Sequence, residues 1–485
     1  MGSRALWLIA AATLAGFALR YPGIHQSYFG DELFTADILR AGSLSGVLHG
    51  VTSTESTPPL YYVAGWLFGK LGDPLVWGRV PSLVCGTLAI PATWLLGRRT
   101  VGEPAALIGA GIVALAPTAI FYSSEARAYG MLLLLSTAAL WLLLVALERG
   151  DRRAWAAFAL VSIAALYTHY TAAFPLAAGV AWGLWQAPER RRAVLMASGA
   201  VALAYVPWLP HLGANPLLEL GTPLSFESAV RFSGRLLPGH PYVTLPELPG
   251  KPALVLFALA LVVAAAACLV RRRPGTSRGG APPPLILLAL VALATPAGLV
   301  LYSLLKTDIF QPRYLLASLP AYALLIGALL VGPRGRLALA TSAAALAAVA
   351  WGGISTAFDA GRRRPPYNDA AAFVEAHAKP GDAVADVPLF LIKSTRNSVL
   401  DVNLPPARKV FTAFPVRRPN GRYDPVIDRA AWRAVAAGHA LYVVTPHVQG
   451  RLAVPAPPRG QRVRLVRRTL FDGFIEVGVF EYRRG

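Results

Sequence analysis

The chain alternates long apolar runs with short polar connections. About eleven of these runs are expected to be membrane-spanning helices, because crossing a bilayer takes about 20 predominantly apolar residues. They lie at about 5–20, 76–97, 104–122, 128–147, 154–170, 172–187, 193–210, 252–270, 283–305, 313–332 and 336–353. The pattern predicts an α-helical polytopic membrane protein, with most of its helices embedded in the lipid bilayer.

One apolar run is too short to be another span. Residues 58–71 read PPLYYVAGWLFGKL, and Lys70 interrupts their end. A run of 10–14 apolar residues fits an interfacial helix better than a span. The sequence therefore predicts a juxtamembrane helix in the first long loop, residues 21–75.

The tail, residues 360–485, has a different pattern. Its charge rises, Pro and Gly recur, and its apolar runs shrink to strand length. The predicted elements are helices at 368–378 and 429–437, strands at 383–387 and 441–445, and a hairpin of 463–470 with 474–482. We expect two domains: a transmembrane catalytic domain, 1–355, and a small α/β domain, 360–485.

Composition and charge support a membrane protein. The chain is 55% hydrophobic with a mean hydropathy of +0.50, which excludes an ordinary soluble protein. Its net charge of +21 would suggest a nucleic-acid partner in a soluble protein. Here the arginine clusters lie between apolar runs, so membrane topology explains them and no nucleic-acid partner is predicted. Cys85 and Cys268 lie within apolar runs and indicate no disulfide framework.

The arginine clusters also predict the orientation. If 58–71 does not cross, all the clusters fall on the side of the N-terminus, at 98–99, 149–153, 190–192, 271–278 and 334–336. The positive-inside rule then places the N-terminus in the cytoplasm. The first loop and the C-terminal domain would lie outside.

Two adjacent carboxylates, Asp31 and Glu32, directly follow the first span. Ionisable residues at membrane depth are costly and suggest a function. A carboxylate beside a reacting hydroxyl could act as its general base. The alternative is that Asp31 caps the following helix, with Glu32 in its first turn.

Three basic residues lie at span ends on the predicted outer face. Arg127, Arg313 and Lys306 could each bind a phosphate, and a guanidinium can contact two phosphate oxygens. Arg127 could instead pair with Glu125, or extend its side chain to the membrane interface.

Glu55 and His169 are further candidates on the same face. Glu55 could orient the substrate, bind a metal or be a solvated loop charge. His169 could be a metal ligand, a phosphate donor, a sugar contact or a hydrogen-bonded helix-end residue. Two ligands from distant segments make only a partial metal site, so a divalent cofactor is left open.

The order of five motifs resembles the GT-C glycosyltransferases, especially the bacterial branch around protein O-mannosyltransferases and lipid A aminoarabinose transferases. The resemblance covers about residues 5–330. The motifs are Gly-Asp-Glu (30–32), Glu-Ser-Thr-Pro-Pro-Leu-Tyr-Tyr (55–62), Ser-Glu-Ala-Arg-Ala-Tyr (124–129), Tyr-Thr-His-Tyr (167–170) and Pro-Arg-Tyr-Leu (312–315). It implies a GT-C-like fold with juxtamembrane helices in the first outer loop.

The resemblance also implies an activity. A sugar would pass, with inversion, from a polyprenyl-phosphate carrier to a hydroxyl of a glycan, lipid or protein, at the outer face of the bacterial cytoplasmic membrane. Asp31 would be the base and Glu32 its support, without a nucleotide or a covalent intermediate. The implied site residues are, for the lipid phosphate, Arg127, Arg313, Lys306 and Tyr129, and, for the substrates, Glu55, Tyr61, Tyr62, Glu125, His169 and Tyr170.

The chain departs from these relatives at Thr57, where aminoarabinose transferases have a Lys. Two other functions stay open: a polymer or oligosaccharide ligase with a polyprenyl-diphosphate donor, and a lipid-sugar transporter or flippase. Transporters typically show internal repeats, and none is visible in this sequence. The sugar, whether mannose, arabinose, galacturonic acid or another, is also open.

Overall fold

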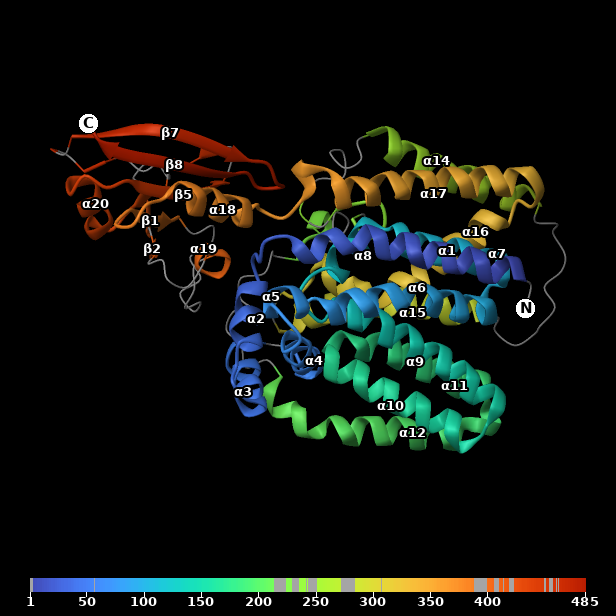
Figure 1. Cartoon of the computed structure of the whole chain (residues 1–485). Helices are drawn as coiled ribbons and strands as arrows, with labels where there is room; N and C mark the ends of the chain where they lie inside the picture. The colour runs from blue at the N-terminus through green and yellow to red at the C-terminus, as the bar shows by residue number, and fades with distance from the viewer. Residues whose placement is uncertain are drawn as a thin grey trace. The chain divides into compact units, whose positions relative to one another are not determined.

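A computed structural model describes most of the chain. The described residues are 3–55, 57–212, 224–228, 235–240, 242, 251–271, 284–306, 308–387, 399–404, 410–412, 414–417, 423–448, 451–452, 457–458, 460 and 462–485. The chain forms two compact units (Figure 1). The first comprises Met1–Ile24 and Ile38–Ala357, and the second comprises His25–Asp37 and Phe358–Gly485.

The first unit is helical. Its helices are α1 (Ser3–Arg20), α3 (Leu44–Thr54), α4 (Leu60–Gly69), α5 (Pro74–Trp77), α6 (Val80–Thr100), α7 (Glu103–Leu115), α8 (Pro117–Ser123), α9 (Tyr129–Arg149), α10 (Arg152–Thr168), α11 (Ala173–Gln186), α12 (Arg191–Tyr205), α14 (Lys251–Arg271), α15 (Pro284–Leu305), α16 (Leu319–Val331) and α17 (Gly335–Phe358). Helix α2 (Glu32–Leu39) begins in the second unit and ends in the first.

The protein is a multi-pass membrane protein. Within the described part of the chain, 8 helices are long and apolar enough to cross a bilayer, or up to 9 if the bent pair α7–α8 is one span. The expected number of eleven is not confirmed. The runs predicted at 154–170 and 172–187 form α10 and α11, which have 17 and 14 residues.

The short apolar run in the first loop forms α4, which has 10 residues. At a rise of 1.5 Å per residue it is about 15 Å long, half the thickness of a bilayer core. A short helix at this place is therefore confirmed, and its position along the membrane surface stays a prediction.

Arg20 stabilises the break between α7 and α8, which are bent by 57°. Pro117 has no N–H, so the helical hydrogen bond to the carbonyl of Val113 cannot form. The buried Arg20 guanidinium donates instead to the carbonyls of Val113 and Ala114, both at 2.9 Å, and to Gly16 at 2.8 Å. The last residue of α1 thus supplies the donors that the broken helix lacks.

The second unit is an α/β domain. Its main sheet has the order β2-β1-β5-β8-β7, with β6 paired to β5, and β3 pairs with β4 in a separate two-stranded sheet. The strands are β1 (Ala383–Asp386), β2 (Val410–Thr412), β3 (Phe414–Arg417), β4 (Tyr423–Val426), β5 (Leu441–Val448), β6 (Arg451–Leu452), β7 (Val463–Phe471) and β8 (Val477–Arg484). The predicted hairpin is confirmed as the antiparallel pair β7–β8.

Three helices accompany this sheet: α18 (Tyr367–His377), α19 (Val399–Asn403) and α20 (Arg429–Ala436). The helices predicted at 368–378 and 429–437 are confirmed as α18 and α20. Trp432 of α20 packs edge-on against Tyr482 of β8, with ring centroids 5.3 Å apart, in a core of buried aliphatic side chains.

We predict that Arg20→Met lowers the stability of the first unit. Two buried carbonyls would lose their donor, which costs about 2–6 kcal/mol at 1–3 kcal/mol for each group. Thermal unfolding in detergent measures this loss as a lower midpoint. Arg4→Met, an exposed arginine on the same helix, is the control, and equal midpoints for both variants would contradict this role of Arg20.

Candidate functional site

Arg127 lies in the loop that joins α8 to α9, and its backbone is fixed by α6. The Ser82 hydroxyl donates to the Arg127 carbonyl at 2.5 Å. Close helix contact makes this possible, because a Cβ on Gly130 would lie 2.4 Å from the Ser82 carbonyl oxygen. Glycine at position 130 therefore lets α9 begin beside α6 and places Arg127.

The Arg127 side chain forms a buried ion pair with Glu55, which follows the last residue of α3. Nη1 of Arg127 lies 2.6 Å from Oε1 of Glu55, and the two side chains are only 7% and 5% exposed. The Glu125 carbonyl accepts the backbone N–H of Arg127 at 2.7 Å, and the side-chain pair of Arg127 with Glu125 stays a prediction.

Tyr62 completes this arrangement. Its ring centroid lies 5.8 Å from the Arg127 guanidinium, and its hydroxyl is 2.8 Å from the Thr57 hydroxyl. Burial raises the pKa of the Tyr62 phenol well above its usual range, more than the neighbouring Arg127 charge lowers it. Tyr62 is therefore a neutral hydroxyl beside a charged pair.

A second group of side chains lies next to Arg127 along the chain. Three tyrosine rings surround the His169 ring. Their centroids lie 5.6 Å (Tyr129), 5.2 Å (Tyr314) and 4.5 Å (Tyr170) from the centroid of the imidazole. The Arg313 guanidinium stands 6.0 Å from the Tyr129 ring and 5.5 Å from the Tyr314 ring. Arg313 thus lies in an aromatic cluster, and Arg127 is near enough for its charge to act on His169.

His169 occupies the turn between α10 and α11 and is fully buried. Its Nδ1 accepts the backbone N–H of Thr171 at 3.2 Å and lies 2.8 Å from the Thr171 hydroxyl. Burial, and then the charges of Arg127 and Arg313, lower the pKa of His169 to about 3. The imidazole is therefore neutral at physiological pH.

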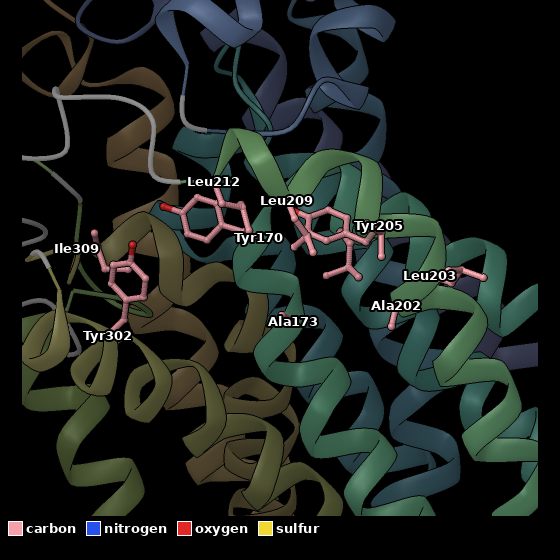
Figure 2. Close-up of a pocket in the computed structure, with 11 residues that line it drawn as sticks. Tyr170, Ala173, Ala202, Leu203, Tyr205, Leu209, Leu212, Tyr302 and Ile309 are labelled. Atoms are coloured by element: carbon pink, nitrogen blue, oxygen red, sulfur yellow. The ribbon is translucent and has the colours of Figure 1, made fainter.

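An apolar groove of about 700 Å³ adjoins this cluster (Figure 2). It lies between the ends of α10, α11, α12 and α15, and Tyr170 belongs both to its wall and to the aromatic cluster. Leu203, Val206 and Leu209 on its rim are half exposed or more, as expected for side chains that face lipid. The lining residues are Leu166, Tyr170, Ala173, Ala202, Leu203, Tyr205, Val206, Leu209, Leu212, Tyr302 and Ile309.

Asp31 and Glu32 belong to the second unit, through the segment His25–Asp37. Asp31 is half-buried and directly precedes α2. Glu32 is fully buried and forms an ion pair with Arg364, in which Arg364 Nε lies 3.7 Å from Glu32 Oε2. The Arg364 side chain is 1% exposed and the Glu32 side chain 0%.

Further contacts bind this segment to the rest of the second unit. The Ser27 hydroxyl donates to the Asn368 amide oxygen at 2.6 Å and accepts the Asn368 backbone N–H at 2.8 Å. The rings of Phe29 and Phe474 meet edge-on at 5.6 Å. The C-terminal domain therefore holds the loop that carries the two carboxylates.

Tyr61 borders the group around Arg127, because its ring meets the Tyr62 ring edge-on with centroids 5.4 Å apart. The Tyr61 hydroxyl donates to the Gly78 carbonyl at 2.8 Å, so this side chain supports the packing of α4. Lys306 is exposed just beyond the end of α15. Sequence reasoning missed Arg364 and Asn368, because single polar residues in a charged tail give no signal of a distant partner.

The site residues do not fit a metal centre. Over the described ranges, no group of three or more His, Cys, Asp and Glu side chains could hold a metal ion. Of the two residues considered for such a site, Glu55 is bonded to Arg127. We derive no step through a metal.

The chain is similar to known membrane glycosyltransferases in sequence and in fold. Residues 56–212 match the family model described as dolichyl-phosphate-mannose-protein mannosyltransferase. ArnT from Cupriavidus metallidurans is similar in its apo state (14% identity, TM-score 0.54) and bound to undecaprenyl phosphate (13%, 0.57), each match covering 98% of this chain and 97% of ArnT. No curated protein matches the chain.

A third structure, the oligosaccharyltransferase AglB from Archaeoglobus fulgidus, is 13% identical with a TM-score of 0.49, over 91% of this chain and 69% of AglB. That likeness is too weak to carry an argument. The match to ArnT shows the fold: this chain is a multi-pass membrane protein with the fold of the GT-C glycosyltransferases. The mannosyltransferase family match runs from just before α4 to just beyond α12.

We predict that Arg364→Met loosens the segment His25–Asp37. Without Arg364, the buried Glu32 carboxylate would be an uncompensated charge. Breaking a buried ion pair in this way lowers stability by about 3–5 kcal/mol. Hydrogen–deuterium exchange should become faster in residues 25–37. The exposed neighbour Arg363 provides the control Arg363→Met, and unchanged exchange in Arg364→Met would show that the ion pair does not hold the loop.

Proposed function

We propose that this protein is an inverting glycosyltransferase that moves a sugar from a polyprenyl-phosphate carrier to an acceptor hydroxyl. The observation that carries the proposal is the apolar groove, which shares Tyr170 with a cluster that contains Arg313 and that the charge of Arg127 reaches at His169. An amphiphile with a long apolar chain and an anionic headgroup matches both parts. A polyprenyl phosphate is such a molecule.

The comparisons support the same substrate class. ArnT, with the same fold, is described bound to undecaprenyl phosphate, and the matching family model is named for a dolichyl-phosphate-linked mannose donor. Both carriers are polyprenyl phosphates. The identity of the sugar does not follow from these matches, and the acceptor is a glycan, lipid or protein hydroxyl.

In the proposed reaction, Asp31 takes the proton of the acceptor hydroxyl while that oxygen attacks the anomeric carbon. The bond from this carbon to the phosphate oxygen breaks on the opposite face, which inverts the configuration. The lipid phosphate leaves with the bonding electron pair. Arg127 and Arg313 stabilise the negative charge that develops on it.

The other groups of the site prepare this chemistry. Glu55 holds the Arg127 guanidinium, and Tyr62 packs against it as a neutral hydroxyl. Glu32 supports Asp31 through its ion pair with Arg364. The positive-inside pattern of the arginine clusters supports a reaction at the outer face of the bacterial cytoplasmic membrane, with the C-terminal domain on that side.

Two alternatives are tested by the same experiments. A ligase with a polyprenyl-diphosphate donor would transfer a glycan only from diphosphate-linked lipids. A transporter or flippase would move lipid-linked sugar across the bilayer without breaking the bond to phosphate.

We predict that Asp31→Asn abolishes sugar transfer, lowering the rate by at least about 100-fold because the amide cannot accept the proton. Insertion into the membrane and binding of undecaprenyl phosphate should be retained. Transfer from lipid-linked sugar by purified variants measures the effect. Wild-type transfer by Asp31→Asn would remove Asp31 as the base.

We predict that Arg127→Met weakens undecaprenyl phosphate binding by about 10-fold or more, the value of a hydrogen bond to a charged group. Binding to protein in nanodiscs measures the affinity, and thermal unfolding reports whether the variant is folded. Arg192→Met, an exposed arginine at the start of α12, is the matched control. Equal affinities of a folded Arg127→Met and the control would place the phosphate site elsewhere.

A further inference from the structure

The hydrogen bonds of His169 define where its proton lies. The backbone N–H of Thr171 can only donate, so Nδ1 of His169 must accept with an unprotonated lone pair. The Thr171 hydroxyl, 2.8 Å away, then donates to the same nitrogen. A neutral imidazole that accepts at Nδ1 carries its proton on Nε2. His169 is therefore a donor at Nε2.

This donor is buried without an acceptor. Nε2 of His169 is inaccessible to solvent and has no hydrogen-bond partner among the described residues. Leaving a buried N–H unsatisfied costs about 1–3 kcal/mol. A ligand that supplies an oxygen acceptor would recover this free energy.

The surroundings of the imidazole select the kind of acceptor. Burial first, and then the positive charges of Arg127 and Arg313, disfavour protonation of His169. The same charges favour an anionic acceptor and oppose a cation. A metal on Nε2 would moreover require this nitrogen to be unprotonated, which the bond from Thr171 opposes.

Tyr170 links the apolar groove to His169. Tyr170 lines the groove (Figure 2). Its ring centroid lies 4.5 Å from that of the His169 ring. A lipid chain in the groove would therefore bring its headgroup within one aromatic ring of the imidazole.

We propose that Nε2–H of His169 donates a hydrogen bond to a non-bridging phosphate oxygen of the lipid-linked donor, between Arg127 and Arg313. This inference rests on the proposed function and deepens it. His169 adds a hydrogen bond without adding a third positive charge. The neighbouring charges of Arg127 and Arg313 favour an anionic phosphate oxygen over a neutral hydroxyl as the acceptor of this bond.

Two substitutions separate the two ring nitrogens. His169→Asn places an amide near the position of Nδ1 and removes the donor at Nε2, whereas the longer side chain of His169→Gln can place an amide N–H near Nε2. We expect His169→Asn to bind undecaprenyl phosphate about 10-fold more weakly and His169→Gln to stay within about 3-fold of the wild type. His49→Asn, at an exposed position of α3, is the control.

Competition with inorganic phosphate identifies the contacted group. Weaker binding of both probes by His169→Asn assigns His169 to the phosphate. Weaker binding of the lipid alone would place His169 against the lipid chain, and an effect confined to a sugar-loaded donor would assign it to the sugar. Either result would overturn the inference.

A measurement on the wild-type protein reports on Nε2 of His169 directly, and the variant serves only to assign the resonance. With 15N-labelled histidine, the Nε2 resonance that is lost in His169→Gln should shift when undecaprenyl phosphate is added, and it should stay protonated from pH 5 to 8. A resonance that does not respond to bound lipid would overturn the inference and leave the proposed function standing. Failure of the wild type to bind undecaprenyl phosphate would overturn both.

Discussion

The buried ion pair of Glu55 with Arg127 is the interaction on which the membrane unit's site depends. Buried charges are tolerated when they are paired, and breaking such a pair leaves an uncompensated charge. With 2.6 Å between the two atoms, the pair joins the end of α3 to the loop between α8 and α9. It therefore fixes a guanidinium close to the aromatic cluster, and the proposed function assigns this guanidinium to the lipid phosphate.

The second unit also contains a buried ion pair between distant segments of the chain. Glu32, from the first loop, pairs with Arg364 from the start of the C-terminal domain, and both side chains are buried. In each unit a carboxylate of the first loop is thus held by an arginine from far along the chain. This gives the C-terminal domain a defined part in the proposed reaction, because it holds the loop that carries Asp31.

Local patterns in the sequence predict many of the helices and strands. They do not predict the ion pairs between residues that are far apart in the chain. Apolar runs located the spans, α4 and the hairpin β7–β8, since burial against lipid or a sheet face leaves a periodic signal. The number of full-length spans was not confirmed, because run length does not show where α10 and α11 end. Glu55 and Arg127 were both candidates, yet their pairing across 72 residues leaves no local trace. Arg364 was missed for the same reason.

The central claim is that a lipid-linked sugar is transferred and not merely bound or moved. The direct measurement uses the purified protein in liposomes with a polyprenyl phosphate that carries a radiolabelled sugar, together with an envelope acceptor fraction. The proposed reaction predicts that the label leaves the lipid phase and joins the acceptor with inverted anomeric configuration, in step with the release of polyprenyl phosphate. Label that stays on the lipid and crosses to the other leaflet would contradict the claim and show a transporter.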